Sequence, residues 1–286
     1  MLIGVFDSGV GGLTVLRALH SRHPGHDFLY LGDTARVPYG RKPPAMVRQF
    51  SREIAAFLLG HNVEALVIAC NTASAAALPE LADQLAVPVW GVIEPGVAAA
   101  KKASRGGRTG IIGTKGTIAS GVYQRKLEAQ GLTVWAQACP LLVHVVEEGL
   151  ANSPEAELLV RHYLADRPEL DTLILGCTHY PVLRETIARV VGPDVHLVDS
   201  AEEISKVVSI SVPEPAWRVG TITHFVTGDA IAYEHTAHVI GGVEGEIKTL
   251  SLAELSLYKL PAYRPSTPKR SEPQAALVTN QSCNDA

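Results

Sequence analysis

Two cysteines stand in matching sequence contexts, and both could take part in proton transfer. Cys70 in LVIACNTA and Cys177 in LILGCTHY each follow an apolar run and precede a polar pair, Asn71–Thr72 and Thr178–His179. This order predicts a sulfur at the carboxyl edge of a sheet, where the N–H groups of a helix start favour an anion. We therefore expect each thiol pKa to lie below its ordinary value of about 8.5. For either cysteine alone, the competing interpretation is a small buried side chain.

Two thiols that face one ligand from opposite sides suit a particular reaction. One sulfur, as the thiolate, removes a proton from one face of a carbon. The other, as the thiol, returns a proton to the opposite face. This is general acid–base catalysis by two monoprotic groups. The pattern predicts an enzyme that inverts a stereocentre.

The elements that must position these residues alternate along the chain. Continuously apolar runs at 65–69 and 172–175 are typical of central parallel strands that are covered on both faces. A helical pattern over 44–60 lies between strands, and such alternation indicates α/β units whose ligands bind beyond the carboxyl ends of the strands. The predicted strands are 2–6, 27–31, 65–69, 87–92, 109–112, 133–136, 172–175 and 195–198.

An internal repeat links the two cysteine segments. GVFDSGVGGL at Gly4 is echoed by GIIGTKGTIA at Gly110, 106 residues later, and the two cysteine segments repeat at an offset of 107. Matched offsets favour duplication over chance similarity of apolar strands. We predict two pseudo-symmetric, doubly wound parallel-sheet domains with the active site in the cleft between them.

The predicted domain boundaries follow from composition and from the repeat. A length of 286 residues allows about two domains. The first is expected to comprise 1–96 plus 208–260, and the second 97–207. Residues 261–286 are rich in Pro, Ser and polar residues and predict a disordered tail. Cys283 in that tail is given no role.

Further candidates stand at the ends of the other strands. Asp7 and Ser8 open DSGVGGLT, a glycine-rich turn whose N–H groups could meet a carboxylate, although helix capping is a common alternative for either residue. Tyr39 and Gly40 in VPYG offer a hydroxyl donor and an amide, although the segment alone would be interpreted as a turn. The spacing of the glycines fits neither a P-loop nor a dinucleotide fingerprint.

Acid–base partners for the sulfurs are expected nearby. His179 lies two residues beyond the second cysteine and is predicted to support its proton, although a lone histidine is more often structural. Asp7 could play the matching part for the first cysteine. Glu147 is a third acidic candidate, and the sequence register alone does not separate it from Glu148.

Composition excludes several classes of function. A net charge of −4 gives no general field for nucleic acid, and no apolar run is long enough to span a membrane. Four cysteines are too few for a secreted disulfide framework, so a cytoplasmic location is expected. The chemistry is expected to need no cofactor, because no pyridoxal, flavin or nicotinamide pattern occurs. His20, His23 and His26, and His235 and His238, lack metal-ligand spacing, so no metal is expected.

Five segments together resemble bacterial glutamate racemases of the aspartate/glutamate racemase superfamily. They are FDSGVGGLT, YLGDTARVPYG, ACNTAS, IGTKGTIAS and GCTHYP, and the resemblance runs from about Leu2 to Tyr258. It implies a cofactor-independent, homodimeric, cytoplasmic enzyme that interconverts L- and D-glutamate and supplies D-glutamate for peptidoglycan.

Carried over residue by residue, the resemblance assigns roles to the candidates above. It places the catalytic cysteines at Cys70, acting on the D isomer, and Cys177, acting on the L isomer, and it aligns the acidic residue of a CPxxVxxxE segment with Glu147. The implied substrate contacts are Asp7, Ser8, Tyr39, Gly40, Asn71, Thr72, Thr178 and His179.

Three alternative functions remain at this stage. An aspartate or hydantoin racemase would use the same paired thiols on another substrate. A binding protein that inhibits a partner such as DNA gyrase would have only secondary activity. A thiol hydrolase could use Cys177 with His179, but no oxyanion hole or orienting group is identifiable for it.

Overall fold

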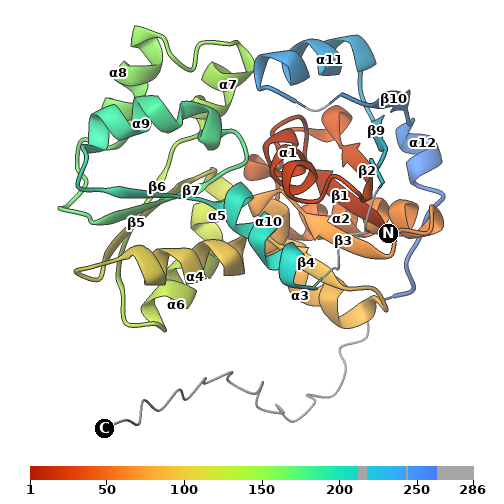
Figure 1. Ribbon diagram of the computed structural model, residues 1–286, viewed down its shortest axis with the longest axis horizontal. Helices are drawn as coiled ribbons and strands as arrows, with labels where there is room; N and C mark the ends of the chain where they lie inside the picture. The colour runs from red at the N-terminus through yellow and green to blue at the C-terminus, as the bar shows by residue number, and fades with distance from the viewer. Residues whose placement is uncertain (212–217, 243, 263–286) are drawn as a thin grey trace, which may run out of the picture.

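The chain folds around two parallel β-sheets, which lie side by side in Figure 1. The computed structural model describes residues 1–211, 218–242 and 244–262. From residue 263 on, the predicted tail lies outside the described residues, as does Cys283. Within the described ranges every strand pairing is parallel. The predicted α/β class is therefore confirmed.

The first sheet has six strands in the order β10-β9-β2-β1-β3-β4. Its strands are β1 (Leu2–Asp7), β2 (Asp27–Gly32), β3 (Ala65–Ile68), β4 (Val89–Gly91), β9 (Ile222–Val226) and β10 (Glu246–Thr249). The second sheet has four strands in the order β6-β5-β7-β8. They are β5 (Arg108–Gly113), β6 (Thr133–Ala138), β7 (Thr172–Gly176) and β8 (His196–Asp199).

The two sheets repeat one strand order, as the internal sequence repeat predicts. The order β2-β1-β3-β4 in the first sheet matches β6-β5-β7-β8 in the second. The repeated glycine segments follow β1 and β5, and the two cysteines follow β3 and β7. The carboxyl ends of equivalent strands therefore carry equivalent loops.

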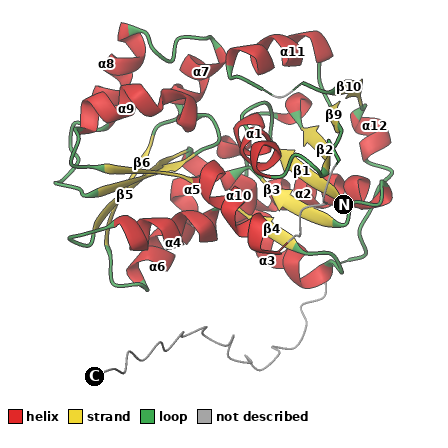
Figure 2. Cartoon of the chain, in the orientation of Figure 1, coloured by secondary structure: helices red, strands yellow, loops and turns green. Residues whose placement is uncertain are grey.

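Helices cover both sheets (Figure 2). The helix predicted over 44–60 is present with those bounds, starting at Pro44 and burying Val47, Ile54 and Phe57. The helices are α1 (Leu13–Arg22), α2 (Pro44–Gly60), α3 (Asn71–Gln84), α4 (Ile93–Ala103), α5 (Lys115–Ser120), α6 (Val122–Glu128), α7 (Leu141–Glu147), α8 (Pro154–Tyr163), α9 (Arg184–Val191), α10 (Ser200–Ser211), α11 (Ala230–Val239) and α12 (Leu252–Leu255). Short 3₁₀ turns are η1 (Thr34–Arg36), η2 (Tyr39–Arg41) and η3 (Tyr180–Leu183).

A shared hydrophobic core joins the two halves. Helix α1 packs against α10, which lies between the sheets in Figure 1. Leu16 of α1, Ile204 of α10 and Leu175 of β7 are fully buried in one cluster. Burial of this apolar surface fixes how the loops of one half approach those of the other.

All eight predicted strands are present, and the structure adds two that the sequence pattern did not indicate. Strand β9 alternates between buried and partly exposed positions, and no residue of β10 is buried. Strand β10 is the outer edge of its sheet. A mostly exposed edge strand lacks the apolar run by which the other strands were recognised.

Candidate active site

A small cavity lies where the carboxyl ends of the two sheets meet. Its volume is about 110 Å³. Every residue predicted for the site lines it except Asp7. The lining residues are Ser8, Gly9, Val37, Pro38, Tyr39, Gly40, Cys70, Asn71, Thr72, Thr114, Val143, His144, Glu147, Cys177, Thr178 and His179.

Cys70 is the N-cap residue of α3. The N–H of Ala73 donates to its sulfur at 3.4 Å, and the thiol donates to Ser8 Oγ at 3.7 Å. Burial raises the pKa of Cys70 to about 12, and the nearby charge of Asp7 adds to this effect. The hydrogen bond from Ala73 N–H and the interaction with the Ser8 hydroxyl lower the pKa, but by less. The predicted lowering of this thiol pKa is therefore wrong, because desolvation of the thiolate outweighs the helix start.

Asp7 does not line the cavity itself but directly precedes Ser8, which does, and it is fully buried. Its Oδ2 accepts a hydrogen bond from the N–H of Gly9 at 3.0 Å, so the carboxyl group organises the glycine-rich turn. Oδ1 has no hydrogen-bond partner. Burial raises the pKa of Asp7, while the charge of His179 acts in the opposite direction.

Cys177 heads a chain of three titratable groups. It follows β7, and the short turn η3 comes after it in place of the predicted helix. Its sulfur lies 3.8 Å from His179 Nδ1, and His179 Nε2 lies 2.9 Å from Glu147 Oε1. The sequence left Glu147 and Glu148 as alternatives, and the geometry selects Glu147, whereas Glu148 is exposed.

The neighbours of His179 favour the protonated form of its imidazole. Burial alone would lower the pKa of His179, but Cys177 and Glu147 outweigh it and raise the pKa to about 10. Burial would likewise raise the pKa of Glu147, yet the hydrogen bond and charge of His179 keep it below its ordinary value. The imidazolium thus stands between a carboxylate and a sulfur, where it stabilises negative charge on either side.

The glycine-rich turn lets the two halves approach closely. A Cβ atom on Gly11 would lie 2.4 Å from the His179 ring and from Thr178 Oγ1. Thr14 Oγ1, at the start of α1, donates to the backbone oxygen of Thr178 at 2.8 Å. A residue with no side chain is therefore required at Gly11, because a methyl group would displace the imidazole.

The polar pair after Cys70 is held by groups from the second half. Thr72 Oγ1 lies 2.8 Å from Thr114 Oγ1, and Tyr123 donates its hydroxyl hydrogen to Asn71 Oδ1 at 2.8 Å. Thr114 was not predicted as a site residue. The internal repeat could have found it, because an offset of 106 residues aligns Thr114 with Ser8.

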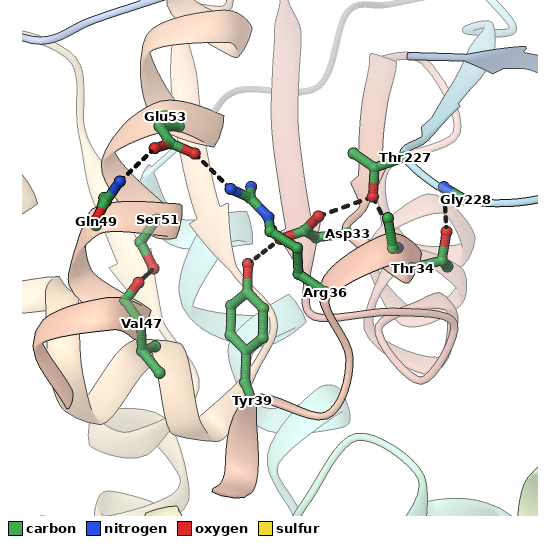
Figure 3. A network of polar contacts seen from close by, with 11 residues as sticks. Asp33, Thr34, Arg36, Tyr39, Val47, Gln49, Ser51, Glu53, Thr227 and Gly228 are labelled. Atoms are coloured by element: carbon green, nitrogen blue, oxygen red, sulfur yellow. Dashed lines mark hydrogen bonds and ion pairs between the residues drawn. The ribbon is translucent and has the colours of Figure 1, made fainter. Parts of the chain in front are cut away.

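The loop that carries Tyr39 and Gly40 is fixed by a buried polar network (Figure 3). The Tyr39 hydroxyl donates to Asp33 Oδ2 and does not point a free hydrogen at the cavity. Arg36 Nε also donates to Asp33 Oδ2, at 2.7 Å, and Thr227 Oγ1 donates to Asp33 Oδ1 at 2.8 Å. The hydroxyl donor predicted at Tyr39 is therefore bonded to the protein, because the fully buried Asp33 accepts from all three groups.

Other features of the described residues bear on function. They contain no group of three or more His, Cys, Asp or Glu side chains arranged to hold a metal ion. His23 Nε2 lies 3.3 Å from the backbone oxygen of Ser205, while His235 and His238 lie on the surface helix α11. Within the same residues, no helix combines the length and apolarity needed to cross a membrane.

Comparison with known proteins decides the family. The sequence model of the Asp/Glu/Hydantoin racemase family matches residues 13–206. The chain belongs to this family. A family member from Thermus thermophilus, curated as a glutamate racemase, is 53% identical over 260 residues, which cover 88% of this chain and 97% of that one. The resemblance predicted from five motifs is thereby confirmed.

Solved structures of the family share the fold. The Thermus thermophilus glutamate racemase in complex with beta-chloro-D-alanine has a TM-score of 0.83 at 51% identity, covering 88% of this chain and 97% of that one. The Francisella tularensis glutamate racemase in complex with D-glutamate has a TM-score of 0.81 at 33% identity, covering 90% and 98%. The two-domain fold predicted from the repeat is that of these family members.

Proposed function

We propose that this protein is a glutamate racemase, an isomerase that interconverts L- and D-glutamate by proton transfer between two cysteines. The observation that carries the proposal is that Cys70 and Cys177, at equivalent positions of the two halves, line one cavity. Their surroundings differ in the way that a two-base reaction needs. The Cys70 sulfur is desolvated by burial, whereas the Cys177 sulfur faces the imidazolium of His179.

The two sulfurs differ in the groups that surround them. A pKa of about 12 keeps Cys70 as the neutral thiol. The Cys177 sulfur lies 3.8 Å from Nδ1 of His179, and Glu147 holds that imidazole from the other side. General acid–base catalysis requires one sulfur as the base and the other as the acid, and we propose Cys177 as the base toward L-glutamate.

In the proposed reaction, the two sulfurs exchange the roles of base and acid. With L-glutamate bound, the Cys177 thiolate takes the α-proton, and the Cys70 thiol gives its proton to the opposite face of the carbanion. D-glutamate leaves behind a Cys70 thiolate and a Cys177 thiol, which is the form that acts on the D isomer. The roles and their stereochemical assignment are part of the proposal.

Stabilisation of the carbanion is the demanding step, because an amino-acid α-proton is weakly acidic. Asn71 lines the cavity, and its buried Nδ2 has no hydrogen-bond partner. Asn71 and the hydroxyls of Thr72 and Thr178 are proposed hydrogen-bond donors to the negative charge that develops on the substrate. Each such donor stabilises the transition state by on the order of 3 kcal/mol. The substrate ammonium is proposed to lie on the side of Asp7, whose Oδ1 is also unpartnered.

The remaining contacts complete substrate binding. Ser8 accepts a hydrogen bond from the Cys70 thiol, and Tyr39 and Gly40 also line the cavity. We further propose domains of 1–96 plus 208–260 and of 97–207, a homodimer, a cytoplasmic location, and D-glutamate supply for peptidoglycan as the biological role. The reaction as proposed needs no cofactor, because both proton carriers belong to the chain.

Circular dichroism tests the proposal directly. Purified protein with no added cofactor should bring either L- or D-glutamate to an optically inactive mixture, and aspartate and a hydantoin serve as competing substrates. Cys70→Ala and Cys177→Ala should each abolish racemisation, while Cys139→Ala, at a buried cysteine outside the cavity, should retain it. Near-normal racemisation by either of the first two variants would refute the two-cysteine mechanism.

A further inference from the structure

The orientation of the Asn71 carboxamide is set from outside the cavity. Asn71 Oδ1 accepts the hydroxyl hydrogen of Tyr123 at 2.8 Å, whereas Nδ2 has no partner. A carboxamide has one acceptor end and one donor end, and the two ends are nearly identical in shape. Whichever end is bonded to the protein decides which end is presented to the ligand.

Tyr123 is itself held firmly. It is fully buried on α6 of the second half, whereas Asn71 begins α3 of the first half. A Cβ on Gly96 would lie 3.3 Å from the Tyr123 hydroxyl oxygen and 3.8 Å from Ser200 Cβ, so the phenol lies between α4 and the start of α10. Helices α4 and α10 include the predicted domain boundaries at 96/97 and 207/208. The hydrogen bond from Tyr123 to Asn71 thus spans the two sheets.

We propose that Tyr123 is a positioning residue for the racemase, whose hydroxyl fixes the Asn71 carboxamide so that Nδ2 faces the reacting carbon. The inference rests on the proposed function, because it assigns Asn71 a donor role toward the carbanion. Without the hydroxyl, the amide can turn by 180°. Its oxygen would then face the developing negative charge and repel it.

The location of the bond adds a second consequence. Tyr123 and Asn71 come from different halves, so the donor is oriented only when the halves have the relative position seen here. Any opening that separates α6 from α3 releases the amide. Tyr123 therefore couples the position of the halves to the presence of a correctly oriented donor.

A double-mutant cycle separates positioning from a merely structural role. The variants are Tyr123→Phe, Asn71→Ala and the pair together, measured with both glutamate isomers. We expect kcat/KM to fall about 100-fold for Asn71→Ala, as for loss of one preorganised donor, and about tenfold for Tyr123→Phe. The double variant should resemble Asn71→Ala alone, and the loss should lie in kcat more than in KM.

Tyr233→Phe provides the matched control. Tyr233 is buried, its hydroxyl lies 2.9 Å from His224 Nδ1, and it does not line the cavity. Tyr123→Phe and Tyr233→Phe should lower the melting temperature similarly, but only the former should lower kcat. Should Asn71→Ala fail to fold, Asn71→Ser replaces it in the cycle.

Two results would overturn the inference. One is a Tyr123→Phe variant whose kcat stays within about twofold of wild type, far from the loss expected for a misplaced donor. The other is an equal loss from Tyr123→Phe in the wild-type and Asn71→Ala backgrounds, since independent sites give additive effects. Absence of racemisation by the wild-type protein would instead refute the proposed function itself.

Discussion

Replacing Glu147 by Gln tests whether the carboxylate, acting through His179, supports Cys177 as a base. The substitution keeps the size of the side chain and its Oε1 acceptor but removes the charge that lies 2.9 Å from His179 Nε2. The imidazolium then loses its carboxylate partner, so less negative charge is stabilised on Cys177 at the far side of the ring. Racemisation should slow while the fold is kept.

The magnitude follows from the hydrogen bond and its exposure. A hydrogen bond to a charged group contributes about 1.5–3 kcal/mol. The Glu147 side chain is 33% exposed, and solvent screening favours the lower end, about 1.5 kcal/mol. At about 1.36 kcal/mol per pKa unit, the pKa of His179 should fall by about one unit and kcat/KM by about tenfold.

The assay combines kinetics with NMR titration. Because L- and D-glutamate have equal free energies, kcat/KM must fall by the same factor in both directions, which provides an internal check. The imidazole of His179 should titrate near pH 10 in the wild-type protein and lower in the variant. Glu148→Gln is the matched control, because the neighbouring carboxylate is exposed and does not contact His179.

Two results would refute this reasoning. If Glu147→Gln keeps kcat/KM within about twofold of wild type, the carboxylate does not support the base to the extent calculated. If His179 titrates near its ordinary pKa of about 6.5 in the wild-type protein, Cys177 and Glu147 do not stabilise the imidazolium as proposed.

Three further outcomes are expected. Gly11→Ala should destabilise the fold by about 1–3 kcal/mol and lower kcat more than tenfold, measured by chemical denaturation and circular dichroism, because its Cβ would lie 2.4 Å from the His179 ring. Tyr39→Phe should cost about 1 kcal/mol and raise KM more than it lowers kcat, since Asp33 keeps its other donors but the loop loosens. Thermal denaturation across pH should show two effects. The stabilisation from protonated His179 is complete below about pH 6.5 and is lost as the pH rises toward 10. The stabilisation from the Glu147 carboxylate is lost in acid, as that carboxylate becomes protonated. A flat profile over the alkaline range would contradict the raised histidine pKa.

Much of the fold was predictable because it rests on local patterns. The strands at 65–69 and 172–175 are continuous apolar runs, and the helix over 44–60 has a proline at its first turn and a regular apolar face. Strands β9 and β10 were missed because neither is a continuous apolar run: β9 alternates between buried and partly buried residues, and β10 has no buried residue. The pairing of β9 with β2, and of β10 with β9, joins segments far apart in the chain and has no signature in their own residues.

The sequence by itself determined which chemistry is available. Two strand-end cysteines at a repeated spacing predicted paired proton carriers, and the residues beside them line the same cavity. Spacing carries this information because parallel strands bring their carboxyl ends to one edge, so equivalent segments of a repeat occupy equivalent places.

Only the tertiary structure decided how the two sulfurs differ. Both follow a strand and precede polar residues, yet burial beside Asp7 raises the pKa of Cys70, while Cys177 faces an imidazolium held by Glu147. Desolvation and charge–charge interactions depend on distances through space between segments far apart in the chain. Local sequence does not contain those distances, so they appear only when the two halves pack together.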